Sequence, residues 1–136
     1  MARIRSVKPE LFDSGSLAKT SRDARYLFVG LFTLVDDEGR LRDLPKKIAG
    51  DLFPYDDDVS ADQVDLWLDA LASVGSVVRY IVNGEPYLYI PQWLAHQKID
   101  HPTKSRLPGP EDADNEAKDQ VTAPRENFAS NSRGSR

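Results

Sequence analysis

Lysine and arginine are the side chains of this chain with the clearest chemical use, because their cationic heads bind phosphate and release its counterions. They gather near the N-terminus, at 46–47, in a β-branched stretch near 79 and between 98 and 106. We predict that these residues contact the backbone of DNA. The predicted contacts are Arg3, Arg5, Lys8, Lys46, Lys47, Arg79, Lys98, Lys104 and Arg106.

A solvated segment without a binding role is the alternative interpretation for two of these regions. The arm at 1–8 precedes the first apolar residues that can pin it to a core, and termini are often solvated. The strap at 91–108 combines basic and amide side chains with prolines. It fits an extension that contacts phosphate, an extension that docks on a partner, or a solvated segment that leaves the domain.

Aspartates form the opposite group and are concentrated in one stretch. Residues 48–75 hold seven Asp and no Lys or Arg, although the chain of 136 residues has a net charge of only −4. On the helix predicted over 60–74, Asp62, Asp65 and Asp69 fall on one side. Such a face repels phosphate, so we predict that it contacts a partner protein. A solvated helix face and mimicry of DNA are the alternatives.

Catalysis and metal binding have little support in the sequence. The chain has no cysteine, which excludes disulfides, thiolate chemistry and Cys-based zinc sites, and its two histidines lack a third zinc ligand. The acidic run at 56–58 lacks the Gly and Glu of an EF-hand, and the run at 36–38 is interpreted as a solvated turn. No phosphate-binding glycine loop or nucleophile motif occurs. We predict no enzyme, no cofactor and no small-molecule substrate.

Composition indicates one folded domain with extensions. Hydrophobic residues make up 40% of the chain, enough for one core, and no apolar run of membrane-spanning length occurs. No signal-peptide stretch follows the basic N-terminus, so we expect a cytoplasmic protein without a membrane partner. The expected organisation is a basic arm with a short helix at 1–20, a domain with its strap at 21–107 and a disordered tail at 108–136.

Three helices and a short strand are predicted before residue 76. The helix at 21–35, capped by Thr20 or Ser21, is apolar around most of its circumference, which is typical of a central helix. Gly30 predicts a close approach by another element. A short strand at 40–43 precedes a helix at 45–53 that has proline in its first turn. The helix at 60–74 has Ser60 as N-cap, Gln63 to complete a capping box and Gly75 as C-cap. Its apolar stripe consists of Val64, Trp67, Leu68, Leu71 and Val74.

A β-hairpin follows, with strands at 76–82 and 87–90 around Asn83-Gly84. A two-residue loop would oppose Tyr80 and Tyr87. We favour a three-residue loop with Gly84 in a bulge, which leaves Arg79 and Tyr87 on the outward face. The buried face would then consist of Val78, Tyr80, Val82, Leu88 and Ile90.

This order of elements predicts an α+β winged helix, with a three-helix core and a small three-stranded antiparallel sheet. The helix at 60–74 would occupy the DNA-recognition position, yet its outer face is acidic. The predicted phosphate contacts therefore lie on the arm, the wing and the strap around it.

Five motifs carry a resemblance to a known family. They are Arg3-Ile-Arg-Ser-Val-Lys-Pro-Glu, Ser21-Arg-Asp-Ala-Arg, Asp36-Asp-Glu-Gly-Arg, Leu52-Phe-Pro-Tyr-Asp-Asp-Asp, and Ile90-Pro-Gln-Trp leading to His96-Gln-Lys-Ile. Over residues 1–108 the chain resembles small winged-helix proteins of actinobacterial phages and prophages. These are similar to the N-terminal domain of phage replisome organisers and DnaD-like primosomal proteins.

The resemblance implies DNA binding or primosome assembly during phage replication in the host bacterial cytoplasm, with replication proteins as possible partners. Transcription control is a second role for such a DNA-binding protein. The chain departs from full replisome organisers in lacking a second folded domain for a helicase, which argues against a complete loader role. The alternative function is a protein-interaction or oligomerisation module, in which the acidic helix faces a partner protein or the hairpin forms a homodimer.

Overall fold

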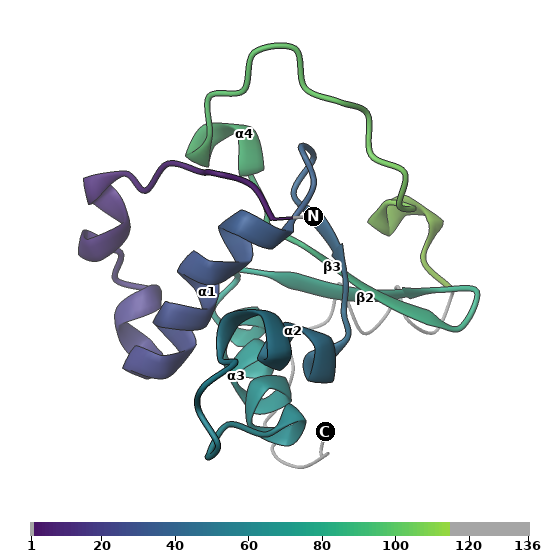
Figure 1. Cartoon of the computed structure of the whole chain (residues 1–136). Helices are drawn as coiled ribbons and strands as arrows, with labels where there is room; N and C mark the ends of the chain where they lie inside the picture. Colours follow the sequence, from purple (N-terminus) through teal and green to yellow (C-terminus); the bar gives the residue numbers. More distant parts are fainter. Residues whose placement is uncertain (1, 115–136) are drawn as a thin grey trace.

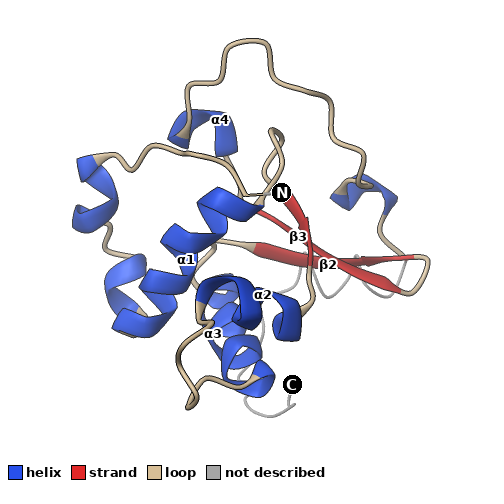
Figure 2. Ribbon diagram, viewed as in Figure 1, coloured by secondary structure: helices blue, strands red, loops and turns tan. Residues whose placement is uncertain are grey.

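Helices pack against one face of a small antiparallel sheet in the computed structural model, which describes residues 2–114 (Figure 2). Within these residues the fold is α+β, with four α-helices and one three-stranded sheet. The helices are α1 (Arg22–Leu34), α2 (Pro45–Leu52), α3 (Ala61–Ser73) and α4 (Trp93–His96), and the strands are β1 (Arg40–Arg42), β2 (Val78–Val82) and β3 (Glu85–Tyr89). Three short 3-10 helices are η1 (Pro9–Asp13), η2 (Leu17–Lys19) and η3 (Pro110–Asp112). In this described part no helix is long and apolar enough to cross a membrane.

The central helix α1 confirms two predictions from the sequence. Ser21 caps it, because its side chain accepts a hydrogen bond from the amide of Ala24. Gly30 lies where α2 comes close, since a Cβ there would stand 2.7 Å from a side-chain carbon of Leu52. A larger residue at position 30 would therefore require the Leu52 side chain to move.

The helix α3 also begins and ends close to its predicted bounds. The Ser60 side chain accepts from the amide of Gln63, and Gly75 follows the helix with a left-handed φ of 83°. Its inner stripe of Val64, Leu68 and Leu71 is fully buried. The amphipathic pattern of α3 therefore organises the core as expected.

The sheet has the strand order β1-β3-β2, and both pairs are antiparallel. β1 pairs with β3 through Leu41 opposite Leu88, which confirms the short strand predicted at 40–43. Val77 and Ile90, which flank the hairpin strands, join Leu88 in the core beneath the helices.

The favoured hairpin register is wrong. Tyr80 lies opposite Tyr87 and Val82 opposite Glu85, so the loop has only two residues. Asn83 and Gly84 have φ of 51° and 79°, and a turn with two positive φ angles matches the right-handed twist of the strands. The faces of β2 are therefore exchanged, with Arg79 beside Leu88 toward the helices and Tyr80 beside Tyr87 on the outer face. On the second strand Leu88 is buried and Tyr87 faces outward, as predicted.

The outer face of the hairpin is covered by the chain after the strap. Tyr80, Tyr87 and Ala113 form a second buried cluster, and the Tyr80 hydroxyl donates to the carbonyl of Pro108 over 2.6 Å. Figure 1 shows this green segment leaving α4, looping outward and returning to the end of the hairpin. The prediction of a disordered tail from residue 108 is wrong for residues 108–114, because they complete this cluster. Residues 115–136 lie outside the described part.

The N-terminal arm runs along the C-terminal end of α1 (Figure 1). The amide of Arg3 donates to the carbonyl of Thr33 over 2.8 Å. The side chain of Gln97, which is buried, exchanges two hydrogen bonds with the backbone of Ser6. The arm is therefore held to the domain by hydrogen bonds, although within residues 2–8 every residue except Arg5 is exposed.

Candidate nucleic-acid interface

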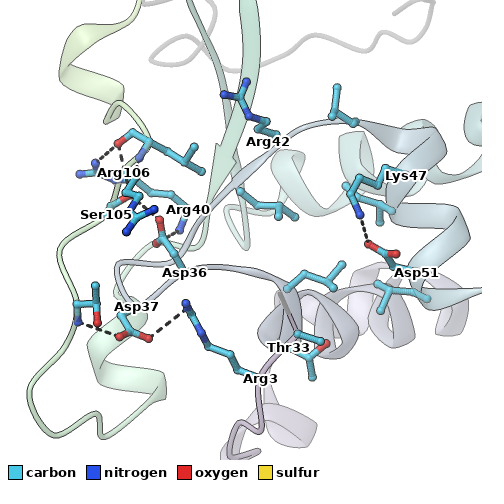
Figure 3. Close-up of a pocket in the computed structure, with 18 of the residues that line it drawn as sticks. Arg3, Thr33, Asp36, Asp37, Arg40, Arg42, Lys47, Asp51, Ser105 and Arg106 are labelled. Atoms are coloured by element: carbon cyan, nitrogen blue, oxygen red, sulfur yellow. Dashed lines mark hydrogen bonds and ion pairs between the residues drawn. The ribbon is translucent and has the colours of Figure 1, made fainter.

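A groove of about 820 Å³ opens between the N-terminal arm, α2, β1 and the strap (Figure 3). Six cationic side chains from these four parts of the chain line it, and we call it the cationic groove. They are Arg3, Arg40, Arg42, Lys47, Lys104 and Arg106. The acidic side chains in the same lining are Asp36, Asp37 and Asp51.

Aliphatic side chains lie between these cations. Leu34, Leu41, Leu44, Ile48 and Leu52 line the groove, and none of its described lining residues is aromatic. Stacking of unpaired bases needs an aromatic surface, which this groove does not offer. The groove would therefore hold a nucleic acid through its cations and not by stacking of bases.

The two arginines of β1 lie on one side of the strand, because side chains two residues apart share a face. Arg40 has a structural role, since its guanidinium donates to the carbonyl of Leu107 over 2.8 Å and lies 3.4 Å from Glu38. Arg42 is exposed, and its guanidinium stacks over the ring of Tyr87 at 5.4 Å. Arg42 is thus a pre-positioned cation.

Three of the remaining cations of the groove are exposed and lie on α2 or on the strap. Lys47, in the first turn of α2, has a 70% exposed side chain and an ion pair of 3.0 Å with Asp51 (Figure 3). Exposed pairs of this kind contribute little stability, so the ammonium group can exchange Asp51 for a phosphate. Lys104 and Arg106 project from the exposed strap.

The acidic turn at 36–38 holds the strap at the edge of the groove. One carboxylate oxygen of Asp36 accepts from the amides of Glu38 and Arg40, and the other accepts from the Ser105 hydroxyl. Glu38 accepts from the amide of Ser105 over 2.5 Å. The interpretation of this run as a solvated turn is therefore wrong, because its carboxylates bind backbone and side chains far away in sequence.

Asp37 joins the arm to the strap in the same turn. It accepts from the guanidinium groups of Arg3 and Arg5 and, over 2.9 Å, from the amide of Thr103. The Thr103 hydrogen bond lowers the pKa of Asp37 below its ordinary value of 3.8; burial opposes this effect and the two arginines add to it. Asp37 is thus ionised at neutral pH and anchors both segments.

Arg5, a predicted phosphate contact, is used inside the fold. Its side chain is only 7% exposed and donates to the carbonyls of Phe32 and Val35, each over 3.0 Å. It also lies over the ring of Trp93 at 5.2 Å. A cation at this position satisfies the last carbonyls of α1 and complements the helix dipole.

Arg79 is the centre of a second charged cluster, and the prediction that it faces outward is wrong. Its guanidinium donates to both oxygens of Asp43, at 2.5 and 2.9 Å, to Asp65 at 2.6 Å and to Asp69 at 3.0 Å. Burial alone would lower its pKa, but the hydrogen bonds and charges of Asp43 and Asp65 raise it above the ordinary value. We call these four residues the Arg79 cluster.

The Arg79 cluster changes the meaning of the acidic helix. Of the predicted partner contacts, Asp65 and Asp69 point to Arg79 on the neighbouring strand, while Asp62 is exposed in the first turn of α3. The acidic face of α3 is therefore partly neutralised within the fold. The Asn83-Gly84 pair could have indicated this position of Arg79, because a two-residue loop gives the register in which Arg79 faces the helices.

The structure gathers only some of the predicted phosphate contacts. Arg3, Lys47, Lys104 and Arg106 meet in the cationic groove, whereas the other five do not line it. Those others are Arg5, Lys8, Lys46, Arg79 and Lys98. Lys8 donates to the carbonyl of Ala95 over 2.7 Å. The sequence interpretation missed Arg40 and Arg42, which the alternation Arg-Leu-Arg on one strand could have indicated.

No group of three or more His, Cys, Asp or Glu side chains within residues 2–114 is arranged to hold a metal ion. Comparison with known proteins finds no matching family model, curated protein or solved structure. The resemblance to winged-helix proteins of phages therefore stays a prediction.

Proposed function

We propose that this chain is a winged-helix protein that binds DNA through backbone phosphates in the cationic groove. The observation that carries this proposal is the convergence of six cationic side chains, from four separate parts of the chain, on one open groove. Clusters of Lys and Arg neutralise phosphates whatever the base sequence. The order of helices and strands, with a hairpin after α3, supports the winged-helix assignment.

In this proposal α3 stabilises the domain and does not read the major groove. Its outer surface carries Asp62 and the 61% exposed Leu66, and neither side chain donates to a phosphate or to a base. Binding would thus depend on charge and on the shape of the backbone, with little base readout. The resemblance to phage proteins makes replication initiation the process we propose, with transcription control as the alternative.

The test is the affinity for a short labelled duplex, measured by fluorescence anisotropy over a series of salt concentrations. The variant Lys104→Gln/Arg106→Gln removes two exposed cations of the groove. We expect the slope of log affinity against log salt to fall by about 1.8, because each lost phosphate contact removes about 0.9. The matched control is Lys19→Gln/Arg22→Gln, which makes the same charge change at exposed positions outside the groove.

The control variant should keep nearly the whole salt slope of the native protein. Equal losses in the two variants would mean that only net charge matters, and the groove would then not be the binding site. Absence of binding by the native chain at low salt, to duplex or single-stranded DNA, would refute the proposal.

The aliphatic lining of the groove favours a second candidate function, which is docking of an acidic protein segment with apolar side chains. Leu44 is 39% exposed there, beside the cations. Leu44→Gln should weaken such a protein complex and leave DNA affinity unchanged. The version in which the acidic helix faces a partner has less support, because Asp65 and Asp69 accept from Arg79. A homodimer stays a prediction, which light scattering after size exclusion would test.

A further inference from the structure

The tip of the β2–β3 hairpin presents two backbone N–H groups to one carboxylate. The strand pairing ends at Val82 and Glu85, so the ladder does not use the amides of Asn83 and Gly84. Both residues have positive φ, a backbone conformation in which successive amides can converge on one anion. One oxygen of Asp114 accepts from Asn83 over 2.8 Å, and the other accepts from Gly84 over 3.1 Å.

The carboxylate reaches this position because the preceding chain is docked on the sheet. The amide of Asp114 donates to the carbonyl of Ile81 over 2.8 Å, and Ala113 is buried against the tyrosines of the outer face. At the other end, the carbonyl of Leu107 accepts from Arg40, a residue of the cationic groove. Residues 107–114, which we call the clasp, therefore run from the groove to the hairpin tip.

The clasp carries negative charge only. Glu111, Asp112 and Asp114 lie in it, and residues 107–114 contain no Lys or Arg. A phosphodiester has two non-bridging oxygens that accept hydrogen bonds as a carboxylate does. The carboxylate of Asp114 at the hairpin tip is therefore, like a DNA phosphate, an anion with two oxygens that accept hydrogen bonds.

We infer that the amides of Asn83 and Gly84 form an anion site for a DNA phosphate and that Asp114 occupies this site in the unbound protein. The inference rests on the proposed function, because it treats the groove and the hairpin tip as one interface. Asp114 then acts as an internal competitor, and DNA binding displaces it from the tip. The clasp lowers affinity for DNA until enough phosphates engage the groove and the tip together.

The test compares Asp114→Asn with Asp112→Asn in the full chain. Asp112 is exposed two residues away in the same clasp, and no hydrogen bond or ion pair of its side chain occurs in the described part, so its variant removes the same charge without changing the tip. We expect Asp114→Asn to bind the labelled duplex about tenfold more tightly than Asp112→Asn, since it removes a charged competitor for two hydrogen bonds. Its salt slope should match that of Asp112→Asn, because DNA displaces Asp114 in the native complex too and the slope counts phosphates neutralised by Lys and Arg, not those bound by uncharged amides.

Equal affinity of the two variants, with groove-dependent binding intact, would overturn the inference and leave the proposed function standing. Failure of the native chain to bind DNA would instead refute the proposed function. The site itself is tested without DNA by adding inorganic phosphate to the Asp114→Asn protein. The amide NMR signals of Asn83 and Gly84 should shift there more than in the native chain, and equal shifts would overturn the anion site.

Discussion

The Arg79 cluster and the cationic groove contain the same kinds of side chain and use them in opposite ways. In the cluster three carboxylates surround one guanidinium that is only 17% exposed, and Asp43 is buried. In the groove, exposed cations outnumber the carboxylates, and two of these carboxylates, Asp36 and Asp37, already accept from backbone amides. The cluster therefore stabilises the fold, while the groove keeps cations available for a ligand.

The difference shows why the charge of a segment does not by itself indicate its partner. Residues 48–75 have no Lys or Arg, and yet two of their aspartates are neutralised by an arginine from the following strand. Conversely, the positive arm places Arg5 inside the fold. What matters for binding is which charges remain exposed after the internal ion pairs have formed.

The largest expected effect is on stability and concerns Arg79. The variant Arg79→Met leaves the buried carboxylate of Asp43 without its partner, which costs roughly 3–5 kcal/mol of the free energy of unfolding. Urea denaturation followed by circular dichroism would measure this change. The matched control is Arg42→Met on β1, the other edge strand of the sheet. The Arg42 side chain is exposed, so the same chemical change there should cost about 1 kcal/mol or less.

Similar losses in the two variants would remove the distinction between a structural cluster and an available groove. A large loss confined to Arg79→Met would confirm it. The Arg42→Met protein should at the same time bind DNA less tightly than the native chain.

A smaller effect is expected at Asp37, which belongs to the groove lining but has a structural role. Asp37→Asn weakens the hydrogen bonds from Thr103 and from the two arginines of the arm, and we expect a loss of about 1–2 kcal/mol in unfolding free energy. Asp57→Asn, in the exposed turn before α3, is the control and should change stability by less than about 0.5 kcal/mol. A loss no larger than that of the control would show that the arm and strap dock without Asp37.

The smallest effect is the pH dependence of the same interaction. The Thr103 amide, with the two arginines and against burial, lowers the pKa of Asp37 below 3.8 in the folded state. Its stabilising contribution is therefore complete above about pH 4 and is lost as pH falls through the lower folded pKa. The difference in melting temperature between the native chain and Asp37→Asn should stay constant from pH 7 to about pH 5 and shrink below about pH 4. A difference that does not change in acid would contradict this assignment.

Much of the fold could be predicted, whereas much of the candidate site could not. The N-caps Ser21 and Ser60 and the buried stripe of α3 were predicted from neighbours in the sequence, and the structure confirms them. The hairpin register was missed because both faces of β2 and β3 carry apolar residues, so alternation did not distinguish inside from outside. That single error placed Arg79 on the wrong face.

The sequence by itself determined α1, α2, α3, the strands and the position of the hairpin turn, because caps, prolines and Asn-Gly act on backbone angles within a few residues. Only the tertiary structure decided which charged side chains form internal ion pairs and which remain exposed. Arg79 meets Asp43 across 36 positions of sequence, and Thr103 meets Asp37 across 66. Such pairs depend on the sheet register and on the path of the strap, and a buried charge must find a partner within reach of that geometry. The cationic groove combines the ion-paired Arg3, Arg40 and Lys47 with the exposed Arg42, Lys104 and Arg106.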